Sequence, residues 1–155
     1  MSIDAQLQSL GLILPEPPKP VAAYVPCVRT GNLIVVSGQL PFAGQSLLAK
    51  GSVPSVIPVD QAQQAAAQCV LNGLAIVRQE LGGDLGRIQR VVRLGVFVQS
   101  DVGFSDQSLV ANGASELMQK IFGEAGRHAR AAVGVNALPL NASVEVEFVF
   151  EIRAD

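Results

Sequence analysis

Hydrophobic and polar residues recur along the chain with two periods, one typical of β-strands and one typical of α-helices. Helix-like spacing covers residues 60–81 and 105–122. Strand-like alternation or short β-branched runs cover 21–29, Leu33–Gln39, Ile88–Gln99 and two segments within 129–152. The resulting order, β-β-α-β-α-β-β, predicts an α+β domain with a mixed or antiparallel sheet and both helices on one of its faces.

The first two strands are predicted to form a hairpin. Thr30, Gly31 and Asn32 separate 21–29 from Leu33–Gln39, and both Gly and Asn tolerate the positive φ of a tight turn. Gly38, near the end of the second strand, permits a close approach of another group to the backbone. Residues 42–58 are rich in Gly and Pro, so they are expected to form a loop, with a short strand near Val56.

Both helices are expected to start at polar capping residues. Asp60 suits the first helix and Ser105 the second, because short polar side chains accept hydrogen bonds from the first free backbone amides. Cys69 lies on the apolar stripe of the first helix, so it is expected to be a small core residue; a reactive thiol is the alternative. The apolar stripe of the second helix is predicted to be Leu109, Val110, Gly113, Leu117 and Ile121.

Residues 129–147 combine strong strand signals with charges that need partners. They are predicted to form a second hairpin around a loop that contains Pro139. Period-two alternation assigns one face of Val144–Ile152 to the core and leaves Glu145, Glu147, Val149 and Glu151 on the other. The residues expected to share that second face are Arg130, Ala132, Gly134 and Asn136. The small side chains among them leave room for another chain or a small ligand.

The register of this hairpin bears on what Arg130 can do. Pairing around residues 139–142 would place Arg130 opposite 149–151 and roughly 13–20 Å along the strand from Glu145, at ~3.3 Å per residue. Two interpretations of Arg130 therefore stay open. It either forms a salt bridge with Glu151 at the end of the strand or binds an anionic ligand.

Composition narrows the range of partners. The 155 residues suit one domain, expected to span 21–155 after an N-terminal arm at 1–20 that ends in a Pro-rich connector. Leucines in the arm are expected to pack on the body of the chain or on a neighbouring subunit. Hydrophobic residues make up 49% of the chain and charged residues 15%, which favours contacts with other subunits. A net charge of −2 without a Lys/Arg run disfavours nucleic acid as a partner.

Metal sites and membrane segments are not expected either. Cys27, Cys69 and His128 do not have the spacing of metal ligands, so no metal or other cofactor is predicted. His128 is expected to be a polar residue at the entry to a strand, or alternatively a proton relay, because imidazole titrates near neutral pH. The sequence shows no signal peptide and no apolar run of about 20 residues, so we expect a soluble, cytoplasmic protein without a membrane partner.

Several stretches of the chain resemble the reactive intermediate deaminases, also called the YjgF/YER057c/UK114 or L-PSP family. The sequence LIVVSGQLP is similar to the Ser-Gly-Gln-hydrophobic-Pro signature of that family, and ARAAVGVNALPLNASVEVE is similar to its C-terminal signature. The residues that carry the resemblance are 24–25, 33–41, 129–130, 138–139 and 144–147. The resemblance as a whole covers residues 21–153.

This resemblance implies a chorismate-mutase-like fold and a homotrimer with ligand sites in the clefts between subunits. It also implies hydrolysis of reactive enamines and imines, such as 2-aminoacrylate, to 2-oxo acids and ammonia. In that reaction Arg130 would bind the substrate carboxylate through its guanidinium fork, and Glu145 would activate water and transfer protons. Tyr24, Ser37 and Gly38 would line the substrate pocket. An imine carbon is already electrophilic, so the reaction needs no metal, cofactor or covalent nucleophile.

Four residues and one loop depart from the pattern of the family. Ser115 replaces an aromatic residue in the second helix, and the loop at 101–109 is longer. Ala131 and Ala132 stand where deaminating members often carry a hydroxyl residue and a Cys, and His128 stands where Pro is frequent. A non-catalytic protein that binds small carboxylates is therefore one alternative to the enzyme. An RNA-cleaving translation inhibitor, suggested by the L-PSP name, is another, which the acidic balance and the 5% aromatic content disfavour.

Overall fold

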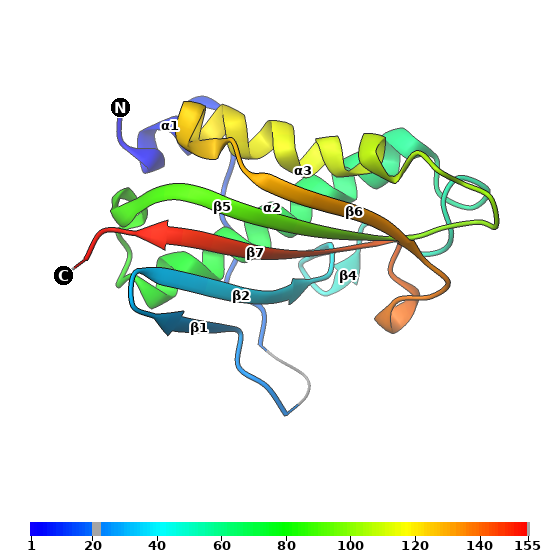
Figure 1. Ribbon diagram of the computed structural model, residues 1–155, viewed down its shortest axis with the longest axis horizontal. Helices are drawn as coiled ribbons and strands as arrows, with labels where there is room; N and C mark the ends of the chain where they lie inside the picture. Colours follow the sequence, from blue (N-terminus) through cyan, green and yellow to red (C-terminus); the bar gives the residue numbers. More distant parts are fainter. Residues whose placement is uncertain (20–22, 155) are drawn as a thin grey trace.

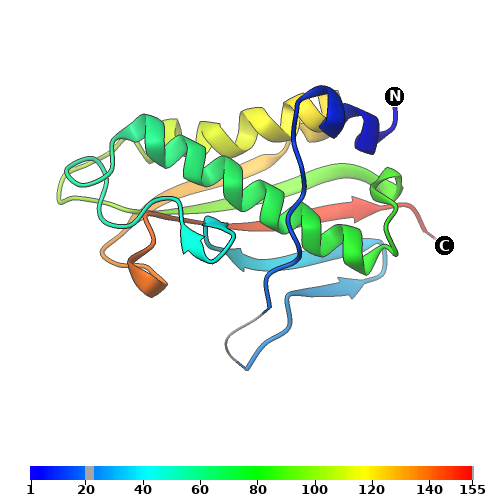
Figure 2. The ribbon, with the colours of Figure 1, turned by 180° about the vertical axis from the view of Figure 1, so that it is seen from behind.

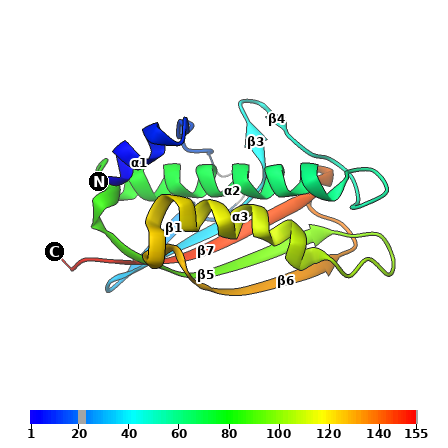
Figure 3. The same cartoon turned by 90° about the horizontal axis from the view of Figure 1, so that it is seen from above.

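Five strands form one sheet, and α-helices cover one of its faces. The computed structural model describes residues 1–19 and 23–154. Figure 3 shows α2 and α3 side by side above the sheet, with no helix of the described chain below it. The elements are α1 (Ile3–Ser9), β1 (Cys27–Thr30), β2 (Leu33–Gln39), β3 (Phe42–Ala43), β4 (Ser46–Leu47), α2 (Val59–Glu80), η1 (Leu85–Arg87), β5 (Ile88–Gln99), α3 (Gln107–Phe122), η2 (Gly123–Gly126), β6 (Ala129–Val135), η3 (Pro139–Asn141) and β7 (Val144–Ile152).

The predicted α+β class and the order of the main strands and helices are confirmed. The first hairpin is confirmed as well, since β1 and β2 pair antiparallel from Thr30 and Leu33 outward. The first strand begins at Cys27, later than predicted, and residues 21–22 of that prediction lie outside the described residues.

β7 lies at the centre of the sheet because its inner face is strongly apolar. Buried and partly buried residues alternate along its length, and it pairs antiparallel with both β2 and β5. Phe148 and Phe150 stack with their ring centroids 5.9 Å apart. Gly73 of α2 lies against this pair, since a Cβ there would come within 2.6 Å of the Phe148 ring. Full burial of each such ring contributes on the order of 1.5–3 kcal/mol of hydrophobic free energy.

The predicted hairpin of residues 129–147 is wrong. β5 lies between β6 and β7 and pairs with both, in parallel with β6 and antiparallel with β7. Figure 1 shows β7 between β2 and β5, with β6 on the far side of β5. Because α3 carries the chain back along the sheet before β6 begins, β6 runs in the same direction as β5. β6 is largely exposed and has small side chains, so it forms the edge, whereas the apolar β7 gains more from two partners.

Helix α2 begins one residue before the predicted cap. Pro58 is the N-cap, and Asp60 lies in the first turn, where its negative charge interacts favourably with the helix dipole. Cys69 is completely buried in the core, as predicted for a small hydrophobic residue. Burial raises the pKa of its thiol well above the ordinary value, which disfavours a reactive thiolate.

Two other local predictions also need correction. α3 starts after Asp106 rather than Ser105, and Leu109 is 46% exposed instead of buried. The buried face of α3 consists of Val110, Ala111, Ala114, Ser115, Met118 and Ile121. Val56 does not lie in a strand; the segment 42–58 forms the short β3–β4 hairpin instead.

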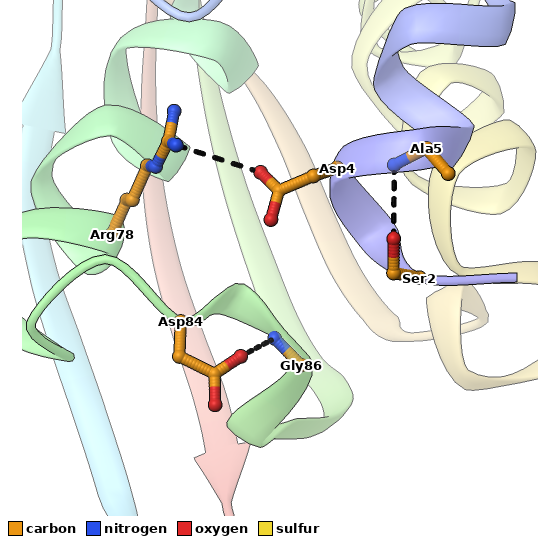
Figure 4. A network of polar contacts seen from close by, with 6 residues as sticks. All are labelled: Ser2, Asp4, Ala5, Arg78, Asp84 and Gly86. Carbon is orange, nitrogen blue, oxygen red and sulfur yellow. Dashed lines mark hydrogen bonds and ion pairs between the residues drawn. The ribbon is translucent and has the colours of Figure 1, made fainter.

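The N-terminal arm packs on the helical layer of the same chain. Ser2 accepts a hydrogen bond from the Ala5 amide at 3.1 Å and caps α1, while Asp4 lies 3.7 Å from Arg78 of α2 (Figure 4). Leu7 is buried in the core. Figure 2 shows the segment after α1 crossing over α2. At least one leucine of the arm therefore packs on the body of its own chain. No helix among the described residues is both long and apolar enough to cross a membrane.

Candidate functional site

A hollow of about 220 Å³ lies where β2 ends beside the start of β7. Three residues selected from the sequence, Tyr24, Gly38 and Glu145, line it together. The other lining residues are Pro18, Lys19, Pro26, Gln39, Leu40, Phe42, Pro139 and Leu140. Most of this lining is apolar, and the charged side chains among the described lining residues are Lys19 and Glu145. A small ligand with one polar end suits such a hollow.

Gly38 allows the Glu145 carboxylate to occupy its position in the hollow. The pairing of β2 with β7 is regular as far as Val36 and then shifts before Gln39, which indicates a bulge over residues 37–38. A Cβ at residue 38 would collide with the Glu145 carboxylate oxygen. Glycine is therefore the residue that fits here, and the close approach of backbone expected at this end of β2 is confirmed.

Ser37 does not itself line the hollow. Its hydrogen bonds instead fix the backbone that follows Tyr24. Its hydroxyl donates to the Val25 carbonyl at 2.7 Å, and its backbone amide donates to the Pro26 carbonyl at 2.9 Å. These two bonds attach the chain before β1 to the bulge of β2. They place Tyr24, which is half-exposed, at the rim of the hollow near Gly38.

Glu145 is a half-buried carboxylate with a raised pKa. Burial is the larger cause, because it disfavours the charged form, and the neighbouring negative charge of Glu147 adds to it. Glu147 itself forms a salt bridge with Arg93 of β5, at 2.9 Å. Glu145 therefore holds a proton more readily than an ordinary glutamate, a property that suits a group that both accepts and donates protons.

An apolar wall of the hollow comes from η3, the turn that precedes β7. Leu140 and Asn141 have φ values of 57° and 61°, a left-handed conformation that costs a residue like Leu on the order of 1–3 kcal/mol. The sequence signature includes Pro139 but gives no sign of this wall. A local pattern does not predict positive φ at a leucine, because that conformation is imposed by the surrounding structure.

Arg130 lies in a different part of the molecule. It pairs with Leu94 of β5, whose side chain is fully buried under the helices, so Arg130 belongs to the helical side of the sheet. Its Nη1 donates to Asn112 Oδ1 at 2.8 Å and to Ser115 Oγ at 3.1 Å, both on α3. The prediction that Arg130 shares a face with Glu145 is therefore wrong.

One of the two interpretations of Arg130, a salt bridge with Glu151, is also wrong. Glu151 pairs with Leu33 of β2 and Arg90 of β5, and its carboxylate accepts a hydrogen bond from Asn32 at 3.0 Å. The error follows from the assumed hairpin, which placed residues 149–151 next to Arg130. With β5 between β6 and β7, Arg130 lies opposite Leu94 and faces α3 instead.

One chain does not bring Arg130 and Glu145 together. Arg130 pairs with Leu94 of β5, and Glu145 pairs with Phe97 of β5. The two residues therefore lie three residues apart along β5, on the strands at either side of it. This corresponds to roughly 10 Å along the strands and about 9.6 Å across them, on opposite faces of the sheet. A ligand bound by both residues would have to contact two copies of the chain.

Arg130 borders a second, more open groove of about 530 Å³, between α3 and the start of β6. Its lining residues are Asn112, Ser115, Glu116, Gln119, Arg127, His128 and Arg130. Sequence reasoning did not assign a role to Asn112 or Ser115. Their signal was the occurrence of polar residues at helical spacing next to the apolar stripe of α3, a pattern that is common on any surface helix.

The described residues hold no recognisable metal site. Within residues 1–19 and 23–154, His, Cys, Asp and Glu side chains do not gather in a group of three or more that could bind a metal ion.

Comparison with protein families decides the assignment of the chain. The family model described as "YjgF/chorismate_mutase-like, putative endoribonuclease" matches residues 4–152. The chain belongs to this YjgF family. The resemblance that the sequence signatures indicated is thereby confirmed, and so is the chorismate-mutase-like fold.

Two curated relatives of this YjgF protein match nearly the whole chain. Protein TCP17 from Trypanosoma cruzi is 44% identical over 152 residues, which cover 97% of this chain and 94% of TCP17. A 2-iminobutanoate/2-iminopropanoate deaminase from Dermatophagoides farinae is 32% identical over 139 residues, which cover 90% of this chain and 93% of the deaminase.

Solved structures superpose on this YjgF protein to different degrees. Atu1372 from Agrobacterium tumefaciens, a protein of unknown function, superposes with a TM-score of 0.91 at 47% identity, covering 97% of this chain and 92% of its own. RidA from the Antarctic bacterium Psychrobacter superposes with a TM-score of 0.60 at 28% identity, covering 88% and 94%. The backbone of this chain thus superposes more closely on Atu1372 than on RidA.

Proposed function

We propose that this YjgF protein hydrolyses reactive imines and enamines, such as 2-aminoacrylate, to 2-oxo acids and ammonia. An enamine first gains a proton at its terminal carbon and becomes the imine. Water then adds to the imine carbon, the hydroxyl of the adduct loses its proton, the C–N bond breaks, and the nitrogen leaves as ammonia with the electron pair of that bond. The observation that carries the proposal is the hollow in which Gly38 and apolar side chains enclose the Glu145 carboxylate. The relative from Dermatophagoides farinae, named as a deaminase of 2-imino acids, supports it.

In this reaction Glu145 is the general base and acid. Its raised pKa makes it a better acceptor for a proton of the attacking water than an ordinary glutamate, and the proton can then pass to the departing nitrogen. Tyr24 lines the same hollow and presents a hydroxyl to the polar end of the substrate. The apolar wall of Leu40, Phe42 and Leu140 faces the side chain of the substrate and excludes bulk water.

We further propose that Arg130 of a neighbouring subunit binds the substrate carboxylate, in a homotrimer with shared sites. Arg130 and Glu145 of one chain lie on opposite faces of the sheet, so a second copy is required for both to contact one ligand. The open face of the sheet also exposes Val28, Val35 and Val133, an apolar surface that other subunits would cover. In a closed ring each chain would supply Arg130 to one neighbour and Glu145 to the other.

The experiment couples the protein to a PLP-dependent dehydratase that releases 2-aminoacrylate and follows the appearance of the 2-oxo acid. We expect Glu145→Gln to lower kcat by about 10²–10⁴-fold, the usual effect of removing a general acid or base. Arg130→Ala should chiefly raise KM, by about 10–100-fold, because it removes a charged hydrogen-bonding partner of the substrate. Arg78→Ala removes the same charge from α2, where Arg78 pairs with Asp4 and lines neither the hollow nor the groove, and it should leave both constants unchanged.

The same assay separates the enzyme from a protein that only binds small carboxylates. If the parent protein gives no acceleration over spontaneous hydrolysis, the proposed enzyme is excluded. A thermal shift caused by a small 2-oxo acid and lost in Arg130→Ala would then identify a carboxylate-binding protein. The thermal-shift experiment is included because Ala131 and Ala132 replace polar residues that are frequent in deaminating members.

A further inference from the structure

The guanidinium of Arg130 ends a chain of hydrogen bonds that begins at the backbone carbonyl of Gly126. We propose that Ser115 and His128 are positioning residues that fix Arg130 in the orientation needed to bind a carboxylate. This inference rests on the proposed function, in which Arg130 is the carboxylate-binding residue.

The contacts of Arg130 leave one side of its guanidinium available for a ligand. Nη1 donates to Asn112 at 2.8 Å and to Ser115 at 3.1 Å, which uses both of its hydrogens. Among the contacts between described residues, these are the hydrogen bonds that Arg130 makes through its side chain. Nε and Nη2 therefore remain for an incoming carboxylate, which a guanidinium binds with two parallel hydrogen bonds.

Only one assignment of donors and acceptors satisfies the hydrogen bonds that run from Gly126 to Arg130. The Gly126 carbonyl can only accept, and His128 Nδ1 lies 2.6 Å from it, so Nδ1 carries the proton. In a neutral imidazole Nε2 is then an acceptor, and it lies 2.9 Å from Ser115 Oγ. The Ser115 hydroxyl accordingly donates to His128 and keeps its lone pairs for Arg130. We assign this tautomer from the hydrogen-bond network.

The surroundings of His128 favour this neutral form. Burial lowers the pKa of His128, the Gly126 carbonyl raises it, and the positive charge of Arg130 lowers it further. The other charged groups at the groove are Glu116 on α3 and Arg127, which pairs with Glu124 of η2 at 3.6 Å. A neutral His128 avoids placing a second cation beside Arg130 and keeps Nε2 as an acceptor.

The helix and strand that carry these hydrogen-bonding residues are suited to fixing the orientation of Arg130. Ser115 is only 7% exposed and belongs to α3, which packs on the core, so its hydroxyl is a fixed acceptor. His128 comes directly before β6, on which Arg130 lies at the exposed edge of the sheet. Arg130 alone would be a flexible side chain at a solvent-exposed edge, and ordering it at the moment of binding would weaken the affinity.

The experiment compares variants that keep or remove individual atoms of the chain. Ser115→Ala removes the acceptor, and Ser115→Thr retains a hydroxyl. His128→Gln places an amide oxygen near the position of Nε2, whereas His128→Asn places an amide nitrogen near the position of Nδ1. Gln63→Ala, which removes a hydrogen bond from Gln63 to the Leu109 carbonyl at the other end of α3, is the matched control.

We expect Ser115→Ala to raise KM for the carboxylate substrate about tenfold with little change in kcat, the loss typical of one charged hydrogen bond. Ser115→Thr and His128→Gln should keep KM close to that of the parent, and His128→Asn should raise it. Nitrogen-15 spectra of the Arg130 guanidinium should show restricted rotation in the parent and in Gln63→Ala, and faster rotation in Ser115→Ala. If His128 only supports the Gly126 turn, KM will stay close to that of the parent in His128→Asn and will rise in His128→Gln, which would overturn the inference.

The two readouts keep this inference separate from the proposed function. If Arg130→Ala raises KM while Ser115→Ala changes neither KM nor the rotation of the guanidinium, the positioning role is wrong and the proposed function stands. If Arg130→Ala leaves KM unchanged, the proposed function fails in its carboxylate-binding part. Faster rotation in Ser115→Ala would then still support the role of Ser115 in fixing Arg130.

Discussion

The hollow around Glu145 and the groove around Arg130 differ in almost every physical property. Glu145 is half-buried beside apolar side chains and another glutamate, and its raised pKa reflects a site that disfavours a negative charge. Arg130 is exposed at the edge of the sheet, and its partners are a neutral amide and a neutral hydroxyl rather than a carboxylate. Glu145 in the hollow can therefore accept a proton, while Arg130 at the groove has a positive charge that can bind an anion.

This difference indicates two complementary halves of one site. A substrate with a carboxylate at one end and an imine at the other needs a cation for the first and a proton-transferring group for the second. The fold places these groups about two strands apart on opposite faces, so each half is incomplete in a single chain. The proposed assembly joins them without requiring either half to change shape.

The largest effect should come from a substitution that disturbs the hollow and leaves the groove intact. In Gly38→Ala the added Cβ would occupy the space of the Glu145 carboxylate and displace it. We expect kcat to fall about 100-fold, as for loss of a general base, with KM changed little because Arg130 is unaffected. Steady-state kinetics would measure this.

A double variant provides the control for Gly38→Ala. In a Glu145→Gln background the carboxylate is already lost, so Gly38→Ala should lower kcat by less than about twofold more, since effects on one group are not additive. Full additivity of the two losses would show that Gly38 acts on something other than Glu145.

A smaller effect should appear in the stability of the hollow. Because the pKa of Glu145 is raised above its ordinary value of 4.5, the folded state binds more protons than the unfolded state, and ionisation of Glu145 opposes folding as pH rises. Glu145→Gln should therefore raise Tm by about 2 °C at pH values above the raised pKa. The gain should vanish below about pH 4.5, where the carboxyl is protonated in both states. Calorimetry across this range would check it, and a lower Tm at neutral pH would contradict the origin given for the shift.

Local patterns in the sequence predict the elements well because each period follows from the geometry of one strand or helix. The strands Leu33–Gln39 and Ile88–Gln99 and the two main helices come within two residues of their observed bounds. Pairing between strands is a different matter. It depends on where α3 returns the chain, so the sequence did not reveal that β6 is parallel to β5, and the face of Arg130 was mispredicted with it.

The candidate site could be predicted in part for the same reason. Gly38 and Glu145 lie in short signature segments, and the structure brings both to one hollow with Tyr24. Leu140 and Ser115 could not be found in this way. Leu140 contributes through an unusual φ that tertiary contacts impose, and Ser115 contributes through a hydrogen bond between segments that lie far apart in the sequence.

The most direct test of the shared site mixes subunits of two variants that are each strongly impaired when the substrate concentration lies well below KM. Arg130→Ala and Glu145→Gln chains are unfolded together, refolded, and shown by native mass spectrometry to form mixed oligomers. If each site takes Arg130 from one subunit and Glu145 from its neighbour, random mixing restores both residues in roughly a quarter of the sites. We expect about that fraction of the parent activity with 2-aminoacrylate, and none when Glu145→Gln is mixed with the Arg130→Ala/Glu145→Gln double variant. Mixed oligomers without any recovered activity would contradict the shared site.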